Sequence, residues 1–276
     1  MADSFKVYAR PRLFSPNMLA CWPGIGNVSL IIGEYLLKKL EFKDLGEIEP
    51  AYFFDPIGVM VQDNVVEAPR FPQNQFYYWK NRKGKSDLIL FMGEAQPPIK
   101  GYELANHVLD FGLKYRIRRV YTCAAAVTRI HHTEQPRVWG VATQPGITRE
   151  LARFDLVQKG SLQIAGLNGL LLGVAKERIV EGVCLLGEVP TYATRVPSPQ
   201  AALAVSGVLA ALLDIGLDTR ELAQEAAEMK ARLKQVAAEA MGEYIDYFTE
   251  PIWERGQEES EEGGEEENGE EGYGTG

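Results

Sequence analysis

The segment at residues 161–190 reads S-L-Q-I-A-G-L-N-G-L-L-L-G-V-A-K-E-R-I-V-E-G-V-C-L-L-G-E-V-P, and it decides the fold class. A short apolar run at residues 162–165 stops at a Gly-Leu-Asn-Gly turn, and a helical segment and a second apolar run at residues 183–186 follow. This order predicts a βαβ unit, and its continuous apolar strands favour a parallel sheet covered on both faces. Such sheets place functional residues just past the carboxyl ends of the strands, where Asn168 and Glu188 fall.

Along the rest of the chain, apolar runs alternate with segments of helical periodicity, which is typical of an α/β fold. We therefore expect a mainly parallel sheet flanked by helices, with a helical C-terminal segment. Strand-like runs between residues 51 and 79 have no helix between them, which predicts an antiparallel edge or an insertion there. The expected strands are residues 18–22, 52–55, 59–62, 76–79, 87–92, 119–123, 138–142, 162–165 and 183–186, and the expected helices are residues 27–40, 102–115, 167–178, 199–213 and 219–248.

The negative charge of the chain is concentrated at its C-terminus. The formal net charge is -9, and the sequence after Arg255 has nine glutamates and no lysine or arginine. The other 29 of the 38 acidic residues are balanced by 29 lysines and arginines. A neutral body argues against nucleic acid as the main partner. We expect residues 1–255 to form a single α/β domain that includes the C-terminal helices, and residues 256–276 to be a disordered acidic tail.

The cysteines and the hydropathy pattern indicate the compartment. Cys21, Cys123 and Cys184 lie in apolar runs and have no C-x-x-C spacing. This pattern favours buried, reduced thiols in a cytoplasmic protein that needs no metal or cofactor. A catalytic thiol at Cys21 or Cys123 is the alternative. No apolar run approaches the roughly 18 residues that a membrane span requires, so we expect no membrane contact.

The loop at residues 23–27, P-G-I-G-N, follows the first expected strand and opens a helix. Glycines allow backbone amides to converge there, and a helix N-terminus favours an anion. Gly24, Gly26 and Asn27, together with Asn168, are therefore candidates for binding a phosphate or a carboxylate. The alternative is a tight turn that only requires glycine, because Ser29 stands where a dinucleotide fingerprint needs its third glycine.

Two expected strands end in Gly-Glu, at Glu94 and at Glu188. If these strands are parallel, both carboxylates lie at one edge of the sheet and are candidates for general acid–base catalysis. The alternative is that each carboxylate binds backbone amides of a loop. The sequence has no G-x-S-x-G nucleophile motif to support catalysis.

The segment at residues 126–137 carries two adjacent histidines, His131 and His132. On an extended chain such neighbours point in opposite directions, so a hydrogen-bonded loop pair is expected rather than a metal site. Arg129, Arg137 and Arg149 lie near this loop and are either contacts for an acidic partner or solvated surface.

The last expected helix begins with Asp218 as its cap and Glu221 as a capping-box partner. Apolar residues then recur at alternating spacings of four and three, which is typical of a helix that packs along one stripe. This stripe either covers the sheet of the same chain or forms a contact between subunits, for which the candidate residues are Met229, Leu233 and Val236.

Four stretches resemble the proteasome assembly chaperone 2 family. They are W-P-G-I-G-N-V-S at residues 22–29, L-I-L-F-M-G-E-A-Q-P at 88–97, G-L-N-G-L-L-L-G-V-A-K-E-R at 166–178 and C-L-L-G-E-V-P-T-Y-A at 184–193. The resemblance extends from residue 19 to residue 248. It implies a nucleoside phosphorylase-like α/β fold, a homo-oligomer, and a protein that binds other proteins without a settled enzyme activity.

The resemblance also implies a docking signal. Characterised relatives escort proteasome α subunits and dock through a C-terminal hydrophobic–Tyr–any tripeptide. Here Tyr273 is followed by three residues and preceded by glycine, so we expect this contact not to carry over. The leading hypothesis is an assembly-chaperone-like protein that binds a protein partner or its own copies. The alternative is an enzyme of the nucleoside phosphorylase or hydrolase type, with the 23–27 loop holding an anion.

Overall fold

The computed structural model describes residues 5–249 except residues 57 and 159, and for residues 236–249 it describes the backbone alone. The chain divides into two compact units, residues 1–230 and residues 231–276. The first unit contains the α/β fold, and the second begins within the last helix. The sequence predicts a later boundary, at residue 255. The expected acidic tail at residues 256–276 lies outside the described residues.

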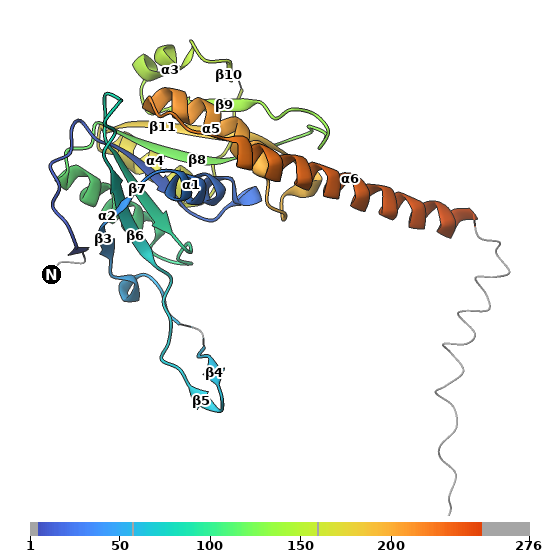
Figure 1. The fold of residues 1–276 in the computed structure, drawn as a ribbon, viewed down its shortest axis with the longest axis horizontal. Coiled ribbons are helices and arrows are strands. Elements are labelled where there is room, and N and C mark those ends of the chain that lie inside the picture. Colours follow the sequence, from blue (N-terminus) through green and yellow to red (C-terminus); the bar gives the residue numbers. More distant parts are fainter. Residues whose placement is uncertain (1–4, 57, 159, 250–276) are drawn as a thin grey trace, which may run out of the picture. The chain divides into compact units, whose positions relative to one another are not determined.

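Among the described residues, nine strands form one sheet in the order β1-β3-β6-β7-β2-β8-β11-β9-β10 (Figure 1). Their bounds are β1 Phe5–Val7, β2 Asn17–Cys21, β3 Lys43–Ile48, β6 Asn74–Trp79, β7 Leu88–Gly93, β8 Arg119–Thr128, β9 Val138–Ala142, β10 Leu156–Val157 and β11 Glu181–Pro190. A separate hairpin consists of β4 Val61–Gln62 and β5 Val65–Val66. The helices are α1 Val28–Lys39, α2 Gly101–Lys114, α3 Pro145–Leu151, α4 Leu167–Glu177, α5 Pro199–Leu213 and α6 Arg220–Thr249.

The four central strands, β7, β2, β8 and β11, run parallel to one another. Every residue of β2 is buried, as a strand covered on both faces requires. Its alternate side chains enter two separate hydrophobic clusters: Met18 and Ala20 pack with α2 and α4, whereas Leu19 and Cys21 pack with α1 and α5. Two helices therefore cover each face of the sheet. This arrangement confirms the predicted α/β class and its mainly parallel sheet.

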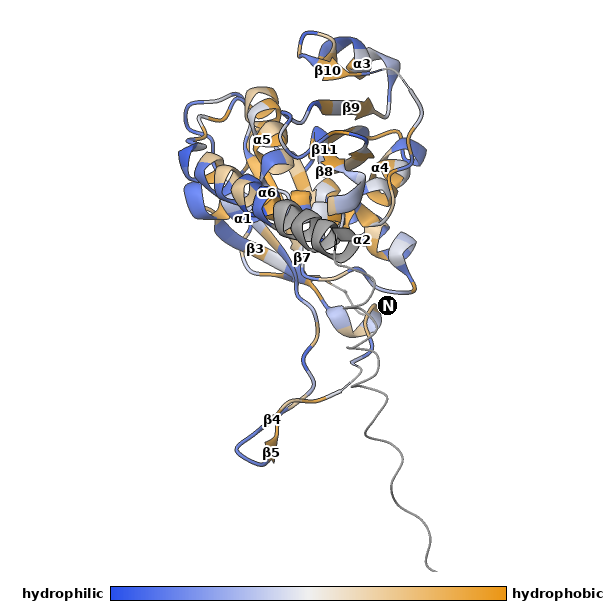
Figure 2. Ribbon diagram, turned by 90° about the vertical axis from the view of Figure 1, so that its right-hand side faces the viewer, coloured by the Kyte–Doolittle hydropathy of each residue, from blue (hydrophilic) through white to orange (hydrophobic). Residues whose placement is uncertain are grey.

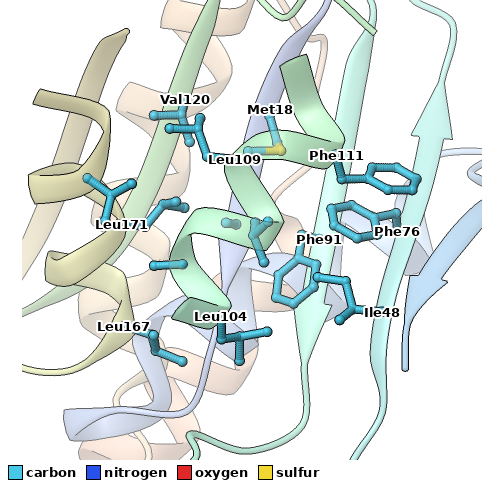
Figure 3. Close-up of a cluster of buried hydrophobic side chains, with 14 of the residues drawn as sticks. Met18, Ile48, Phe76, Phe91, Leu104, Leu109, Phe111, Val120, Leu167 and Leu171 are labelled. Carbon is cyan, nitrogen blue, oxygen red and sulfur yellow. The ribbon is translucent and has the colours of Figure 1, made fainter. Parts of the chain in front are cut away.

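Aromatic rings fill the space between α2 and the sheet (Figure 3). The rings of Phe76 and Phe111 are stacked with their centroids 3.8 Å apart. Phe91 lies between Phe76 and Trp22, at 4.8 Å from each ring. These rings bury a large apolar area, and contacts between aromatic rings add to the free energy of that burial. The cluster fixes α2 against β6, β7 and β2.

The strands on both sides of the parallel core are reversed. β6 pairs antiparallel with β7, β3 with β6, and β1 with β3. On the other side, β9 pairs antiparallel with β11. The antiparallel pairing expected between residues 51 and 79 is therefore present in β6, but β6 lies between β3 and β7, and the edge strand on this side is β1. The hairpin of β4 and β5 is inserted between β3 and β6 and pairs only with itself among the described residues.

Residues 162–165 do not form the strand that the sequence predicts. A strand before α4 would need a free edge of β11, but β8 occupies one edge of β11 and β9 occupies the other. The parallel partner of β11 is therefore β8, and β9, α3 and β10 are inserted between them in the chain. The expected strand at residues 52–55 is also wrong, because a 3-10 turn at Pro50–Tyr52 precedes a segment without regular structure.

The start of α6 differs from the expected capping box. An Asp218 carboxylate oxygen accepts a hydrogen bond from the backbone N–H of Arg220, so Asp218 does stabilise this end. Glu221, however, forms ion pairs with Lys38 and Lys39 on α1 instead of returning to the cap. Farther along the helix, Met229 and Leu233 are half-buried. The side chain of Val236 lies outside the described residues.

The close approach of α5 to β11 predicts an effect on stability. A Cβ atom at Gly187 would lie 2.7 Å from the carbonyl oxygen of Ala201, which belongs to the backbone of α5. We expect Gly187→Ala to lower the free energy of unfolding by about 1–3 kcal/mol, because the helix must shift. Gly207→Ala is the control, since Gly207 lies on α5 with nothing within 4 Å of a Cβ there. It should be neutral or stabilising by up to about 1 kcal/mol. Equal losses in urea denaturation would contradict the account.

Candidate functional site

A cavity of about 530 Å³ lies at the carboxyl ends of the parallel strands. Its walls come from the end of β8, from the loop that follows β2, and from the segment before α4. The lining residues are Gly24, Ile25, Ser29, Gln96, Ala124–Thr128, Trp139, Ser161–Gly166 and Asn168. The apolar run that was expected to form a strand therefore forms one wall of this cavity.

The cavity contains no ionisable side chain among the described residues that line it. Its polar groups are hydroxyls, amides and the indole of Trp139. General acid–base catalysis requires a group that can exchange a proton near neutral pH, and hydroxyls and amides do not. The position of the cavity is that of an α/β active site, but its chemistry is that of a neutral, largely apolar pocket.

The glycine loop before α1 uses its amides inside the protein. The N–H of Asn27 donates to the carbonyl of Gly24, and the N–H of Gly26 donates to the carbonyl of Thr194. The N–H of Ser198 in turn donates to the carbonyl of Gly26, at 2.8 Å. Gly26 has a φ of 63° and leaves only 3.0 Å between a Cβ and Ser198, so glycine is required for this close contact. Of the predicted anion-binding residues, Gly24 and Asn168 line the cavity and Gly26 and Asn27 do not.

Asn168 connects α4 to the end of β2. Its side-chain oxygen accepts hydrogen bonds from the backbone N–H of Trp22 and from the hydroxyl of Ser29, and its amide nitrogen donates to the carbonyl of Trp22. Each of these three bonds measures 3.3 Å, and Asn168 is buried. These contacts use both ends of the amide, so Asn168 serves to join the cavity walls.

Gln96 has a similar role, which the sequence analysis missed. Its side chain donates to the carbonyl of Pro23 and accepts from the backbone N–H of Leu167. It therefore bridges the glycine loop and the N-terminus of α4. No spacing rule identifies a single glutamine in a loop, and only its position next to the L-I-L-F-M-G-E strand indicates this edge of the sheet.

Glu188 is buried and bound to Arg137. One carboxylate oxygen accepts from the backbone N–H and Nε of Arg137, and the other accepts from its guanidinium and from the indole of Trp139. Burial alone would raise the pKa of Glu188, but the hydrogen bonds from Arg137 hold this pKa below its ordinary value of 4.5. The carboxylate is thus ionised and neutralised, and it lies behind Trp139 instead of lining the cavity.

Glu94 and Glu188 both lie at the carboxyl ends of parallel strands, but their carboxylates are not close together. β2 and β8 separate β7 from β11, which places the two strand ends roughly 14 Å apart at about 4.8 Å per strand. Glu94 is exposed and accepts a hydrogen bond from the backbone N–H of Gln73. The structure does not bring the two carboxylates together.

His131 and His132 form a hydrogen-bonded pair in a turn. Their ring centroids are 4.1 Å apart, so they do not point in opposite directions as an extended chain predicts. His131 contacts the hydroxyl of Thr133, and His132 contacts the hydroxyl of Tyr192. Within the described residues, no group of three His, Cys, Asp or Glu side chains could hold a metal ion. Arg129, Arg137 and Arg149 are all exposed, and Arg137 also binds Glu188.

The three cysteines are free and buried. Loss of contact with water raises the pKa of Cys21 and of Cys184 to about 12 and raises that of Cys123 well above its ordinary value. The thiols are therefore protonated at neutral pH, whereas nucleophilic catalysis requires the thiolate. The alternative of a catalytic thiol at Cys21 or Cys123 finds no support in this geometry.

Comparison with known proteins identifies the family. The PAC2 family model matches residues 18–237. This chain belongs to the PAC2 family. PbaB of Pyrococcus furiosus, described as an archaeal proteasome activator, is 28% identical, with a TM-score of 0.73 over 84% of this chain and 98% of PbaB. An uncharacterized protein of Methanocaldococcus jannaschii is 28% identical over 78% of this chain and 80% of its own length.

A second archaeal structure shares the fold of this PAC2 protein. PbaA of Pyrococcus furiosus, described as an archaeal homolog of proteasome-assembly chaperone, has a TM-score of 0.63 and 22% identity over 82% of this chain and 93% of PbaA. The family resemblance expected from the sequence is therefore confirmed. The nucleoside phosphorylase comparison was part of that expectation, and it stays a prediction. No helix in the described part of the chain is both long and apolar enough to cross a membrane.

The hairpin of β4 and β5 is an exposed apolar surface that the sequence analysis did not single out. Asp63 and Asn64 both have positive φ, which forms a two-residue turn that matches the twist of the strands. Figure 2 shows the hairpin separated from the sheet, with its strands coloured as hydrophobic. Its exposed apolar residues, 49–68% accessible, are Val59, Met60, Val61, Val65 and Val66.

The contacts of Glu188 predict a pH-dependent effect on stability. Glu188→Gln replaces an acceptor by a donor facing Arg137 and Trp139, and we expect it to cost about 1–3 kcal/mol at pH 7. Because the pKa of Glu188 is lower in the folded state than its ordinary 4.5, the carboxylate stabilises the protein above pH 4.5. This stabilisation is lost as the pH falls through the lowered pKa. The difference between wild type and variant in urea denaturation should therefore shrink in acid.

The control for this experiment is Glu94→Gln. Glu94 is exposed, so its variant should stay within about 0.5 kcal/mol of wild type at every pH. Equal losses for the two variants, or a difference at Glu188 that does not change between pH 7 and pH 3, would contradict the assignment.

Proposed function

We propose that this PAC2 protein acts by binding other protein chains, in the manner of an assembly chaperone, and is not an enzyme. The observation that carries the proposal is the β4–β5 hairpin. It presents five large apolar side chains to solvent and has no strand partner among the described residues other than itself. Exposed apolar surface of this kind marks protein-interaction sites.

The hairpin has the properties of a surface that a partner covers. An isolated two-stranded hairpin is only marginally stable in water, so burial of Val61 and Val66 against another chain would stabilise it. Its free edges also offer backbone N–H and C=O groups for strand addition. The apolar side chains of the hairpin would supply affinity for the partner, and hydrogen bonds at its unpaired edges would orient the partner chain.

The enzyme alternative has less support. The cavity at the carboxyl ends of the strands is lined by no described ionisable residue, and neither Glu94 nor Glu188 contributes to its walls. The amides of Gly26 and Asn27, which would hold an anion, already donate to carbonyl groups. A nucleoside phosphorylase or hydrolase would require these groups to face a substrate.

The partner class that we propose is the proteasome α subunit, bound through the hairpin and not through the C-terminal tripeptide that characterised relatives use. PbaB is 28% identical to this chain and is described as an archaeal proteasome activator, which supports a proteasome-linked role. We further propose self-association through α6, where Met229 and Leu233 are half-buried. The buried, free cysteines support a reducing compartment, the cytoplasm.

The hairpin predicts how binding responds to mutation. Val61→Lys combined with Val66→Lys places two charges on directly opposite residues of the hairpin. We expect at least a tenfold loss of affinity for purified proteasome α subunits from the same cell, measured by biolayer interferometry, because the charges would have to be buried. The melting temperature should change by no more than about 2 °C, since these side chains are exposed in the free protein.

The control is Ile99→Lys, which also replaces an exposed apolar side chain by a lysine. Ile99 lies outside the hairpin and is 76% accessible. It should bind as wild type does. If Ile99→Lys and the double variant lose affinity equally, or if the double variant binds as wild type does, the hairpin is not part of the interface. Nucleoside turnover by the purified protein would contradict the non-enzymatic part of the proposal.

A further inference from the structure

The amino ends of the parallel strands lie at the end of the sheet opposite the cavity. The loops there carry a concentration of positive charge. Three loops lead into β2, β7 and β8, at residues 8–16, 80–87 and 115–118. We call their lysines and arginines the basic rim: Arg10, Arg12, Lys80, Arg82, Lys83, Lys85, Arg116 and Arg118.

Hydrogen bonds hold the three loops side by side. The backbone N–H of Phe14 donates to the carboxylate of Asp87 at 2.7 Å, and the N–H of Asp87 donates to the carbonyl of Phe14 at 3.0 Å. The N–H of Arg118 donates to the carbonyl of Pro16 at 2.7 Å. The hydroxyl of Tyr115 donates to the carbonyl of Ala9. The eight cations therefore lie on three loops that contact one another.

The cations of the basic rim have no salt-bridge partner among the described residues, although the pKa of Glu150 is lowered by Arg119 and, more weakly, by Arg118 of the rim. All eight side chains are exposed, and none forms an ion pair with a described residue. The acidic residue within the three loops is Asp87, which is buried and accepts from the backbone N–H groups of Phe14 and Asn81. The acids near the rim include Asp214, which is exposed and whose carbonyl accepts from Asn81, and Glu150, which forms an ion pair with Arg119. Other cations of this chain, such as Arg119 and Arg178, have carboxylate partners.

The loop at residues 80–87 is built to present its charges in a fixed position. Asn81 is buried: its side-chain oxygen accepts from the backbone N–H of Gly84, and its amide donates to Asp214 at the end of α5. The four cations of this loop flank these two anchored positions. Beside them, the ring of Phe14 is 72% exposed, although its backbone is held by Asp87.

We propose that the basic rim binds an extended, glutamate- or aspartate-rich segment of a protein partner, with Phe14 as an apolar anchor among the charges. The proposal rests on the proposed protein-binding function and adds a second contact, at the edge of the sheet opposite the cavity. Charged groups around an exposed aromatic ring give orientation and fast association, and the ring gives contact area.

Three observations favour an acidic protein segment over nucleic acid. Apart from the eight cations of the rim, residues 1–255 carry 29 acidic residues against 21 lysines and arginines, so a uniformly charged polymer is repelled outside the rim. A short acidic segment of a protein, unlike such a polymer, brings its negative charge to the basic rim alone. The PAC2 relatives described as a proteasome activator and an assembly-chaperone homolog also act on proteins.

The test is a fluorescence anisotropy titration with a labelled peptide of ten glutamates. Arg82→Glu, Lys83→Glu and Lys85→Glu together should weaken binding by about tenfold or more at 50 mM salt. The matched control reverses three exposed cations elsewhere, Arg129→Glu, Arg149→Glu and Arg195→Glu, and should lose less than about threefold. Phe14→Ser should weaken a glutamate peptide that contains a phenylalanine more than it weakens the plain peptide.

A form of the protein that ends at Arg255 is titrated in parallel, because the nine glutamates after that residue can compete with the probe. Absence of peptide binding in both forms overturns the proposal, as does equal weakening by the two triple variants. Tighter binding of a single-stranded oligonucleotide than of the peptide, lost on the same rim reversal, overturns it in favour of nucleic acid. The Val61→Lys/Val66→Lys variant should bind the peptide normally, so failure of the hairpin proposal and failure of this one are distinguishable.

Discussion

Four parallel strands covered by helices on both faces impose the constraint on which the rest of this molecule depends. Because β7, β2, β8 and β11 run in one direction, all their carboxyl ends meet at one edge of the sheet and all their amino ends at the other. Alternate side chains of β2 enter both hydrophobic clusters, so neither face is free for binding. Contacts with other molecules must therefore use the two ends of the parallel strands, the segments inserted between strands or the outer surfaces of the helices.

At the carboxyl edge, the polar residues serve to hold the fold together. Asn168 and Gln96 join the loop after β2 to the N-terminus of α4, and Glu188 is neutralised by Arg137. An α/β enzyme keeps such groups directed toward a substrate, where they are only partly satisfied until it binds. Here each group has its partners within the protein, which is the arrangement of a structural site.

The elements that sequence analysis located well are those whose signals are local. α5 has the predicted bounds, because proline stands at its first position and Asp214 ends it in the left-handed conformation. Residues 162–165 were misassigned because strand formation depends on a free neighbouring edge, which β9 occupies from elsewhere in the chain. The same limit applies to function. The sequence could place Asn168 and Glu188 at the carboxyl ends of the strands. It could not show that the polar atoms of these two side chains are hydrogen-bonded to Trp22 and Arg137.

The central claim is that this PAC2 protein works through exposed surface instead of its cavity. Hydrogen–deuterium exchange of the full chain, alone and with an excess of purified proteasome α subunits, tests it most directly. The account predicts slower exchange at the backbone amides of residues 59–66, with unchanged exchange at residues 161–168 beside the cavity. Protection confined to residues 161–168, with residues 59–66 exchanging as in the free protein, would contradict it.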